Sequence, residues 1–293
     1  YLYVHLSNIL DPKGIVHICH GKAEHIGRYK WLISKLNDDG YHVIAIDHRG
    51  HGKKILNKDD IGKFSDHQNG WDLVVNDYEI LINDTKKSFP RIKAISFCPI
   101  VWGSWDRIIN DKKRNLKIDG INSLWIFKNS PKFLIAAQKF IIKIDIFFNG
   151  RGRINNVMET ITTNRFNNYF KPTRTISDWI STDNNNVDDY VQDDLCGFKV
   201  TNGLWMDMAQ GIEDSFKSKN YNSANKNIPV LVISGSEDPV GDFKKGVMSL
   251  YNFLGKFFNN VNIKIFEEER HEVFSGTKKV EAYKLLNSFI ERI

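Results

Sequence analysis

Two polar clusters in the C-terminal third of the chain carry residue types that work together in catalysis. Asp238 follows the strand-like run VLVIS, and His271 follows the strand-like run NIKIF further along the chain. An acid at one strand end and a histidine at a later one is the chain order of a Ser…Asp…His relay. In such a relay the carboxylate fixes the tautomer of the imidazole, and the imidazole accepts the proton of a nucleophile. Asp238 and His271 are candidates for these two roles, and an ordinary structural pair is the alternative.

A glycine-containing turn near the N-terminus could present backbone amides to a substrate. The residues HGKAEH (His20–His25) come directly after the strand-like run GIVHIC. Gly21 allows the backbone to turn sharply, so that amide N–H groups can face a pocket. We therefore expect His20 and Gly21 to lie at the substrate site.

A second histidine-rich turn, DHRGHG, follows the run HVIAI. Asp47 and Arg49 are expected to tie neighbouring loops together by charge-assisted hydrogen bonds. His48 and His51 could ligate a metal ion, but no third ligand is evident. The sequence therefore predicts neither a metal site nor an organic cofactor.

The elements that must position these residues alternate between strands and helices. The expected strands are Gly14–Cys19, His42–Ile46, Ile92–Phe97, Ile121–Phe127, Val230–Ser234 and Val261–Phe266, and the expected helices are Arg28–Leu36, Trp71–Lys87, a charged piece reaching Asn115, Phe243–Phe258 and Val280–Ile293. This alternation predicts an α/β fold with a mostly parallel, doubly wound sheet covered on both faces. Reactive groups in such folds gather at the carboxyl ends of the strands.

One long segment interrupts the alternation. Residues 130–227 contain an apolar stretch, a basic glycine-containing turn and asparagine-rich segments. We interpret them as a helical cap inserted into a core formed by residues 1–129 and 228–293. The alternative is a set of additional helices without a role at the substrate site.

Composition limits the classes of partner. The chain has 293 residues, of which 41% are hydrophobic and 26% charged, as expected for one large globular core. A net charge of +6 favours anionic partners, and a transient contact with a membrane surface is compatible with it. The lysines are spread along the chain rather than clustered, so no nucleic-acid partner is predicted. The oligomeric state is not predicted.

Cysteine usage favours a reducing compartment. Cys19, Cys98 and Cys196 are odd in number and far apart, and the first two lie in apolar runs typical of strands. Buried thiols are therefore expected rather than disulfides. The apolar runs are too short to span a bilayer, and no basic leader precedes YLYVHL. These observations predict a cytoplasmic protein.

Five motifs in a fixed order give a resemblance to a known family. The motifs are HGKAEHIGRY, DHRGHG, GWDLVVND, SGSEDPVG and RHE, and the run DWISTD within residues 130–227 is similar as well. The chain resembles an α/β-hydrolase of the monoacylglycerol lipase and lysophospholipase group, in its bacterial branch, over nearly its whole length. The resemblance implies that Asp238 and His271 are the triad acid and base. It also implies that the Lys22 amide is half of an oxyanion hole, for which only the backbone N–H is needed.

The same resemblance places the nucleophile within AISFCPIVWGSWDR. The family's elbow reads G-H-S-M-G, and counting from either side puts the serine at Ile100 and the two glycines at Cys98 and Trp102. Isoleucine cannot attack a carbonyl, and tryptophan is too large for the second glycine position. Ser96, Cys98 and Ser104 are poor substitutes because each is out of register or badly flanked. Either the chain is a pseudo-hydrolase, or the letters at 98–105 do not report the true residues.

The resulting hypothesis is a serine hydrolase that cleaves carboxylic esters of long-chain acyl lipids, such as a monoacylglycerol or a lysophospholipid. The nucleophile would stand at position 100, and the amides of Lys22 and Val101 would hold the oxyanion. The stretch Phe133–Phe148 and Trp179 are candidates for the lining of an acyl tunnel. Two alternatives stay open: an aminopeptidase-like hydrolase with the same triad, and a catalytically inactive module that binds lipid or protein.

Overall fold

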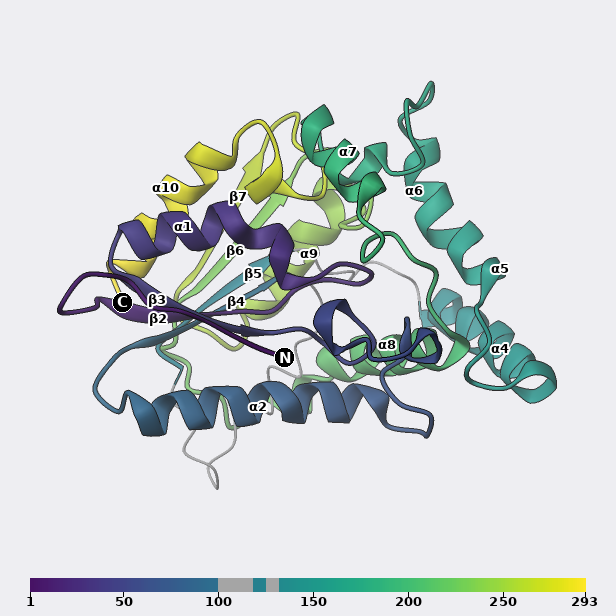
Figure 1. Cartoon of the computed structure of the whole chain (residues 1–293), viewed down its shortest axis with the longest axis horizontal. Helices are drawn as coiled ribbons and strands as arrows, with labels where there is room; N and C mark the ends of the chain where they lie inside the picture. The colour runs from purple at the N-terminus through teal and green to yellow at the C-terminus, as the bar shows by residue number, and fades with distance from the viewer. Residues whose placement is uncertain (100–117, 125–131) are drawn as a thin grey trace.

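A seven-stranded sheet runs through the structure, a computed structural model that describes residues 1–99, 118–124 and 132–293 (Figure 1). Its strand order is β1-β3-β2-β4-β5-β6-β7. The strands are β1 (Leu2–His5), β2 (Gly14–Ile18), β3 (Tyr41–Ile46), β4 (Ala94–Pro99), β5 (Gly120–Leu124), β6 (Val230–Gly235) and β7 (Val261–Phe266). Strand β1 pairs antiparallel with β3, and every other pairing is parallel. The predicted α/β class with a mostly parallel sheet is confirmed.

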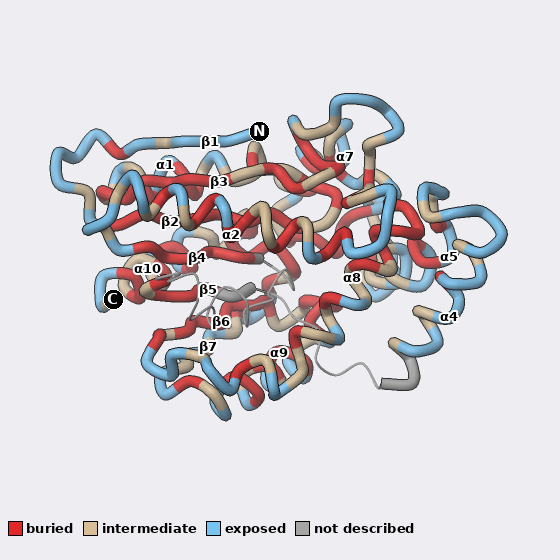
Figure 2. The backbone as a smooth tube through the Cα atoms, turned by 90° about the horizontal axis from the view of Figure 1, so that it is seen from below, coloured by how far each residue is buried: buried red, intermediate tan, exposed pale blue. Residues whose placement is uncertain are grey.

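Helices cover both faces of the sheet. Helices α1 (Lys30–Asp38) and α10 (Lys279–Ile290) cover one face, and α2 (Gly70–Ser88) and α9 (Phe243–Leu254) cover the other. The other described α-helices are α4 (Lys132–Asn149), α5 (Asn156–Glu159), α6 (Arg165–Asn168), α7 (Asn184–Gln192) and α8 (Asn202–Ser215). Successive strand residues point to opposite faces, so Ile15 packs in the cluster with α2 and α9, and Val16 packs in the cluster with α1 and α10. Two hydrophobic cores therefore enclose the sheet. Strands β2 and β6 are buried along their whole length, whereas the edge strands β1 and β7 are partly exposed (Figure 2).

The predicted element boundaries differ from the structure at a few places. Strand β4 starts at Ala94 rather than Ile92, because the Ile92 amide is used in a turn, where it donates to the Phe89 carbonyl. Helix α9 ends at Leu254 rather than Phe258, and the residues after Gly255 fold back in a tight turn onto its last carbonyls. The predicted helical piece reaching Asn115, and the end of the strand predicted to reach Phe127, lie outside the described residues.

Between β5 and β6 the described residues 132–227 add no strand to the sheet, and we call them the β5–β6 segment. Its helix α8 packs against both α2 and α4. Its loops contact the turns that follow the strands. The Gly197 amide donates to the Ala23 carbonyl, and the Glu272 amide donates to the Ile180 carbonyl. The division into a core and a cap over residues 130–227 stays a prediction.

The apolar stretch Phe133–Phe148 forms helix α4, much of which faces solvent (Figure 2). Phe140, Phe147 and Phe148 are 64%, 83% and 74% exposed. The prediction that this stretch lines an acyl tunnel is wrong for these three phenylalanines, because they lie on the outer face of the helix. No described helix combines the length and the apolar composition that a membrane span requires.

Candidate active site

The structure brings Asp238 and His271 together at the ends of two neighbouring strands. The Nδ1 atom of His271 lies 2.9 Å from Oδ1 of Asp238, and both side chains are buried. Asp238 Oδ1 also accepts from the Val240 amide at 2.9 Å, which holds the carboxylate in place. Because a carboxylate can only accept, Nδ1 of a neutral His271 carries the proton and Nε2 carries the lone pair. This is the tautomer that a general base requires.

Backbone hydrogen bonds fix the two loops against each other. The Glu237 amide donates to the Glu269 carbonyl at 2.9 Å, and the Ser236 amide donates to the Phe266 carbonyl at 2.9 Å. The buried Glu269 side chain accepts from the Lys278 amide and from the Thr182 hydroxyl, which joins the histidine loop to the β5–β6 segment. The position of His271 therefore depends on main-chain hydrogen bonds and on the Glu269 side chain, in addition to its own side chain.

Trp179 packs directly on the candidate base. Its ring lies 4.9 Å from the His271 ring, centroid to centroid, and it is 9% exposed. Its Nε1 atom is buried and meets no acceptor among the described residues. The sequence singled out Trp179 as a lining residue, and the structure places it beside the histidine.

Internal hydrogen bonds stabilise the turn His20–His25, and they use the His20 ring and the Gly21 amide. His20 accepts at Nε2 from the His48 amide at 2.8 Å, so its Nδ1 donates to the Gly21 carbonyl at 2.8 Å. Burial lowers the pKa of His20 to about 3, which keeps the ring neutral. The Gly21 amide donates to the Glu24 carboxylate. His20 and Gly21 therefore support the turn, and neither leaves its polar side-chain or amide group for a substrate.

The Lys22 amide differs from that of Gly21. Among the described residues no acceptor takes a hydrogen bond from it. Ala23 follows with φ at 54°, a left-handed conformation that is uncommon for a residue with a Cβ atom. The Ala23 carbonyl accepts from the Gly197 amide at 2.9 Å and from the Tyr190 hydroxyl at 3.2 Å, and these contacts stabilise the turn.

A buried charged group links this turn to the histidine loop. Arg28 forms an ion pair with Glu272, which follows His271, and it lies close to Glu24. Tyr29 donates to Glu24 at 3.0 Å. Burial, reinforced by the neighbouring Glu272 carboxylate, raises the pKa of Glu24 to about 7. The sequence did not identify this group, since no spacing rule relates Glu24 to Glu272.

The loop-tying role predicted for Asp47 and Arg49 is confirmed. Asp47 accepts from the Ile26 amide at 3.0 Å and from the Tyr3 hydroxyl at 2.7 Å, and Arg49 holds Asp77 with two hydrogen bonds of 2.9 Å. His48 also joins two loops, because its Nε2 atom donates to the His20 carbonyl. This ring serves to hold loops in the folded protein.

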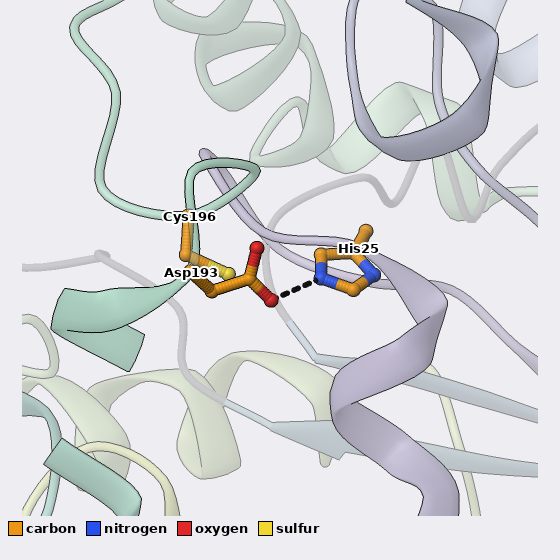
Figure 3. A group of neighbouring side chains, drawn as sticks. All are labelled: His25, Asp193 and Cys196. Atoms are coloured by element: carbon orange, nitrogen blue, oxygen red, sulfur yellow. Dashed lines mark hydrogen bonds and ion pairs between the residues drawn. The ribbon is translucent and has the colours of Figure 1, made fainter. Parts of the chain in front are cut away.

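His25 lies close to the carboxylate of Asp193 and the thiol of Cys196 (Figure 3). His25 accepts from the Gly27 amide at Nδ1, so its Nε2 carries the proton and donates to Asp193 at 2.8 Å. A metal ion would need the lone pair of that Nε2 atom. The group His25, Asp193 and Cys196 is therefore arranged as a hydrogen-bonded link between the turn and the β5–β6 segment, and not as a ligand set.

An apolar cavity of about 330 Å³ opens in the β5–β6 segment. Helices α4, α5, α6 and α8 line it together with residues that follow β6, among them Ile142, Met158, Phe166, Trp205, Met208 and Phe243. Pro239, which adjoins Asp238, also lines it. The sequence did not point to Met158, because it belongs to no motif and to no long apolar run. Trp205 ends the segment Asp178–Trp205 that resembles the family, but no role was predicted for it.

The predicted nucleophile position, Ile100, and its neighbour Val101 lie outside the described residues, as does Ser104. Ser96 and Cys98 are described and buried in β4. The Ser96 hydroxyl lies 2.9 Å from the Tyr78 hydroxyl and 3.4 Å from the Cys98 thiol. Both side chains are enclosed by the core under α2, which agrees with the prediction that they are poor substitutes for a serine on an exposed elbow.

Comparison with known proteins places the chain in a family. The family described as serine aminopeptidase, S33 matches residues 10–104 and 131–278. The phospholipase YtpA of Bacillus subtilis is 24% identical over 285 residues, which cover 96% of each chain. The monoacylglycerol lipase of Mycolicibacterium smegmatis is 37% identical over 88 residues, so the matched part spans only 28% of that protein and 29% of this chain.

Solved structures agree in fold. A carboxyl esterase from Bacillus coagulans superposes with a TM-score of 0.85 at 21% identity, over 99% of this chain and 94% of that one. A soluble variant of the monoglyceride lipase from Saccharomyces cerevisiae gives a TM-score of 0.75 at 16% identity, over 99% and 91% of the two chains. The chain belongs to the serine aminopeptidase S33 family, and it is an α/β-hydrolase of the monoacylglycerol lipase and lysophospholipase group.

Proposed function

We propose that the protein is a serine hydrolase that cleaves carboxylic esters of long-chain acyl lipids, such as a monoacylglycerol or a lysophospholipid. The observation that carries this proposal is the buried Asp238–His271 pair, joined at 2.9 Å beside an apolar cavity of about 330 Å³. The pair supplies a base of the correct tautomer, and the cavity suits an alkyl chain. The names of the matched lipases and of the phospholipase support the same substrate class.

The proposed reaction is acyl transfer through a covalent intermediate. A serine at position 100 attacks the ester carbonyl, His271 accepts its proton, and Asp238 stabilises the imidazolium that forms. The amides of Lys22 and Val101 stabilise the oxyanion of the tetrahedral intermediate. His271 then protonates the leaving alcohol, and water hydrolyses the acyl-enzyme by the same route. In this proposal residues 130–227 act as the cap that encloses the acyl chain.

The letters around position 100 are compatible with a shift of one base in the reading frame. The last base of a Trp102 codon followed by the first two bases of Gly103 always reads GGG, which encodes glycine. If Ile100 is encoded by ATA, its last base and the first two bases of Val101 read AGT, which encodes serine. The shifted frame then gives Ser-x-Gly with the serine at the register of Ile100 and the glycine at that of Trp102, the two residues that an elbow needs.

The nucleotide sequence across Phe97–Arg107 tests this first step. We expect an ATA codon at position 100, a frame disruption on the N-terminal side of it, and a second disruption before Arg107 that restores the frame of the downstream motifs. Protein made from the corrected frame should be labelled by a fluorophosphonate at the serine of position 100, and Asp238→Asn should reduce that labelling by about 10³- to 10⁴-fold. An intact frame, an intact mass that confirms Ile100, and no labelling would overturn the proposal and favour the inactive module.

Hydrolysis of an amide bond is an alternative to hydrolysis of an ester. The family description names aminopeptidases, so amide hydrolysis by the same triad is a second candidate. Paired ester and amide substrates with identical acyl groups separate the two, because an aminopeptidase would retain activity on the amide.

The three cysteines are free and buried, which supports a cytoplasmic location.

A membrane-surface contact is part of the proposal. The exposed face of α4 carries Phe140, Phe147 and Phe148, next to Lys143. Aromatic side chains with adjoining basic groups are typical of surfaces that rest on lipid headgroups. Sedimentation with anionic vesicles should fall when Phe147 and Phe148 are both replaced by serine.

A further inference from the structure

The side chain of Lys22 reaches from the turn after β2 into the β5–β6 segment. Its Nζ atom lies 3.3 Å from Oε1 and 3.4 Å from Oε2 of Glu159, and 3.3 Å from the Thr163 hydroxyl. The ammonium also lies 4.5 Å from the centre of the Trp205 ring. The Lys22 and Glu159 side chains are only 17% and 8% exposed. This is an ion pair largely removed from water, with three different partners for one cation.

The partners of Lys22 belong to the wall of the apolar cavity. Glu159 is the last residue of α5, directly after Met158, and the π-helical turn η4 (Thr160–Asn164) begins next to it. Met158, Ile161 and Trp205 all line the cavity. The ammonium therefore contacts two wall elements, η4 through Thr163 and α8 through Trp205, and Trp205 itself lines the cavity.

The Glu159 carboxylate has further hydrogen-bond donors besides Lys22. It accepts from the Thr163 hydroxyl at 2.9 Å and from the Val200 amide at 3.4 Å. A π-helical turn is rare in proteins and is frequently found at functional sites. The Lys22, Glu159 and Thr163 contacts span this turn and join it to the turn after β2.

We propose that Lys22 determines acyl-chain specificity by tethering the η4 and α8 wall of the cavity to the turn that carries the proposed oxyanion amide. The inference rests on the proposed function, because it assigns the cavity to an acyl chain. Lys22 acts here through Glu159 and Trp205, so its side chain is a positioning group. Removing the ammonium leaves a buried Glu159 carboxylate without its counter-ion, and the wall must move so that water can reach that carboxylate.

Binding measurements test the tether without requiring catalysis. Displacement of 11-(dansylamino)undecanoic acid by hexanoate and by dodecanoate gives the gain in affinity per methylene, which is about fourfold for a fully buried chain. In Lys22→Met we expect the preference for dodecanoate over hexanoate to fall about tenfold. Glu159→Gln should produce a similar fall, and the double variant should be no worse than the weaker single variant, as for two groups that act as a unit.

Two control variants separate the tether from a general loss of charge or of folding. Lys22→Arg retains the cation and should keep the chain-length preference within about threefold. Lys13→Met removes a lysine from an exposed pair with Glu291, where the side chains are 49% and 48% exposed, and should change nothing. Circular dichroism confirms that each variant is folded.

The outcomes are distinguishable. An unchanged chain-length preference in both folded Lys22→Met and folded Glu159→Gln overturns the tether and leaves the acyl cavity in place. Failure of the wild-type protein to bind the dansylated acid overturns the acyl cavity itself, and with it the proposed function.

Discussion

Gly235 at the end of β6 lies directly against the backbone of Glu269. A Cβ atom on Gly235 would overlap the carbonyl oxygens of Glu269 and of Arg270. The close approach of these two main-chain segments is what brings the loop of Asp238 to the loop of His271. Only glycine permits this approach, because any other residue would push the segments apart.

Gly235→Ala should therefore separate the candidate acid and base. We expect a loss of about 2–4 kcal/mol in the free energy of unfolding, since the obstacle is backbone rather than a flexible side chain. Urea denaturation measures the change. Gly255→Ala is a suitable control, because the Cβ at that position meets only ordinary contacts, and it should change stability by less than about 1 kcal/mol. Equal effects of the two substitutions would contradict this account.

The left-handed backbone at Ala23 predicts that the stability of the fold depends steeply on the shape of the side chain at this position. Its φ of 54° is costly for an alanine by about 1–2 kcal/mol, and it is more costly for a β-branched residue. Ala23→Gly removes this strain but loses a buried methyl group and gains flexibility in the unfolded chain, so the net change should be smaller than about 1 kcal/mol. Ala23→Val should destabilise by at least about 2 kcal/mol. Thermal and urea unfolding of the two variants provide the comparison, and a tolerated valine would show that the turn is not constrained as described.

Glu24 predicts a pH dependence of stability with a definite sign. Its pKa rises from the ordinary value of 4.5 to about 7 on folding, with burial as the main cause. Between these values the native state holds the proton and the unfolded state does not, so this group makes stability fall as the pH rises from about 4.5 to about 7. Above that range both states are ionised, and the contribution is constant.

Replacing Glu24 by glutamine removes the titration and keeps an acceptor for the Gly21 amide. Glu24→Gln should therefore gain stability relative to the wild type as the pH is raised from 5 to 8. Urea denaturation at four pH values measures the difference. Glu267→Gln, a change at a surface residue paired with Lys244, is the matched control. A constant difference between Glu24→Gln and the wild type across this range would contradict the assigned titration.

Trp179 predicts a separation between substrate affinity and stability. Its indole N–H is buried and has no acceptor among the described residues, so it can donate to a polar group of a substrate beside His271. Trp179→Phe keeps an aromatic ring against the histidine, and stability should change by less than about 1.5 kcal/mol. If the proposed function holds, protein with a serine at position 100 should show a rise in KM of about tenfold for a monoacylglycerol with little change in kcat. Unchanged KM in a folded variant would assign the indole to packing alone.

The sequence by itself determined the fold class and the order of the six strands from β2 to β7, and it singled out Asp238 and His271 as candidates for a catalytic pair. These follow from local patterns: a β-branched run, a helical period and a polar cluster at a strand end are each written in consecutive residues. The loop-tying role of Asp47 and Arg49 was predictable for the same reason. The five ordered motifs added the family.

Tertiary structure decided which of the remaining residues meet. Glu159 and Trp205 lie far along the chain from Lys22, and no spacing rule connects them, so their contact with its ammonium emerges only when the β5–β6 segment packs on the turn. His20 was expected at the substrate and is instead closed in by the His48 amide and the Gly21 carbonyl. The exposed phenylalanines of α4 show the same limit: an apolar run predicts a helix, but the neighbours that pack against that helix decide which of its faces is buried.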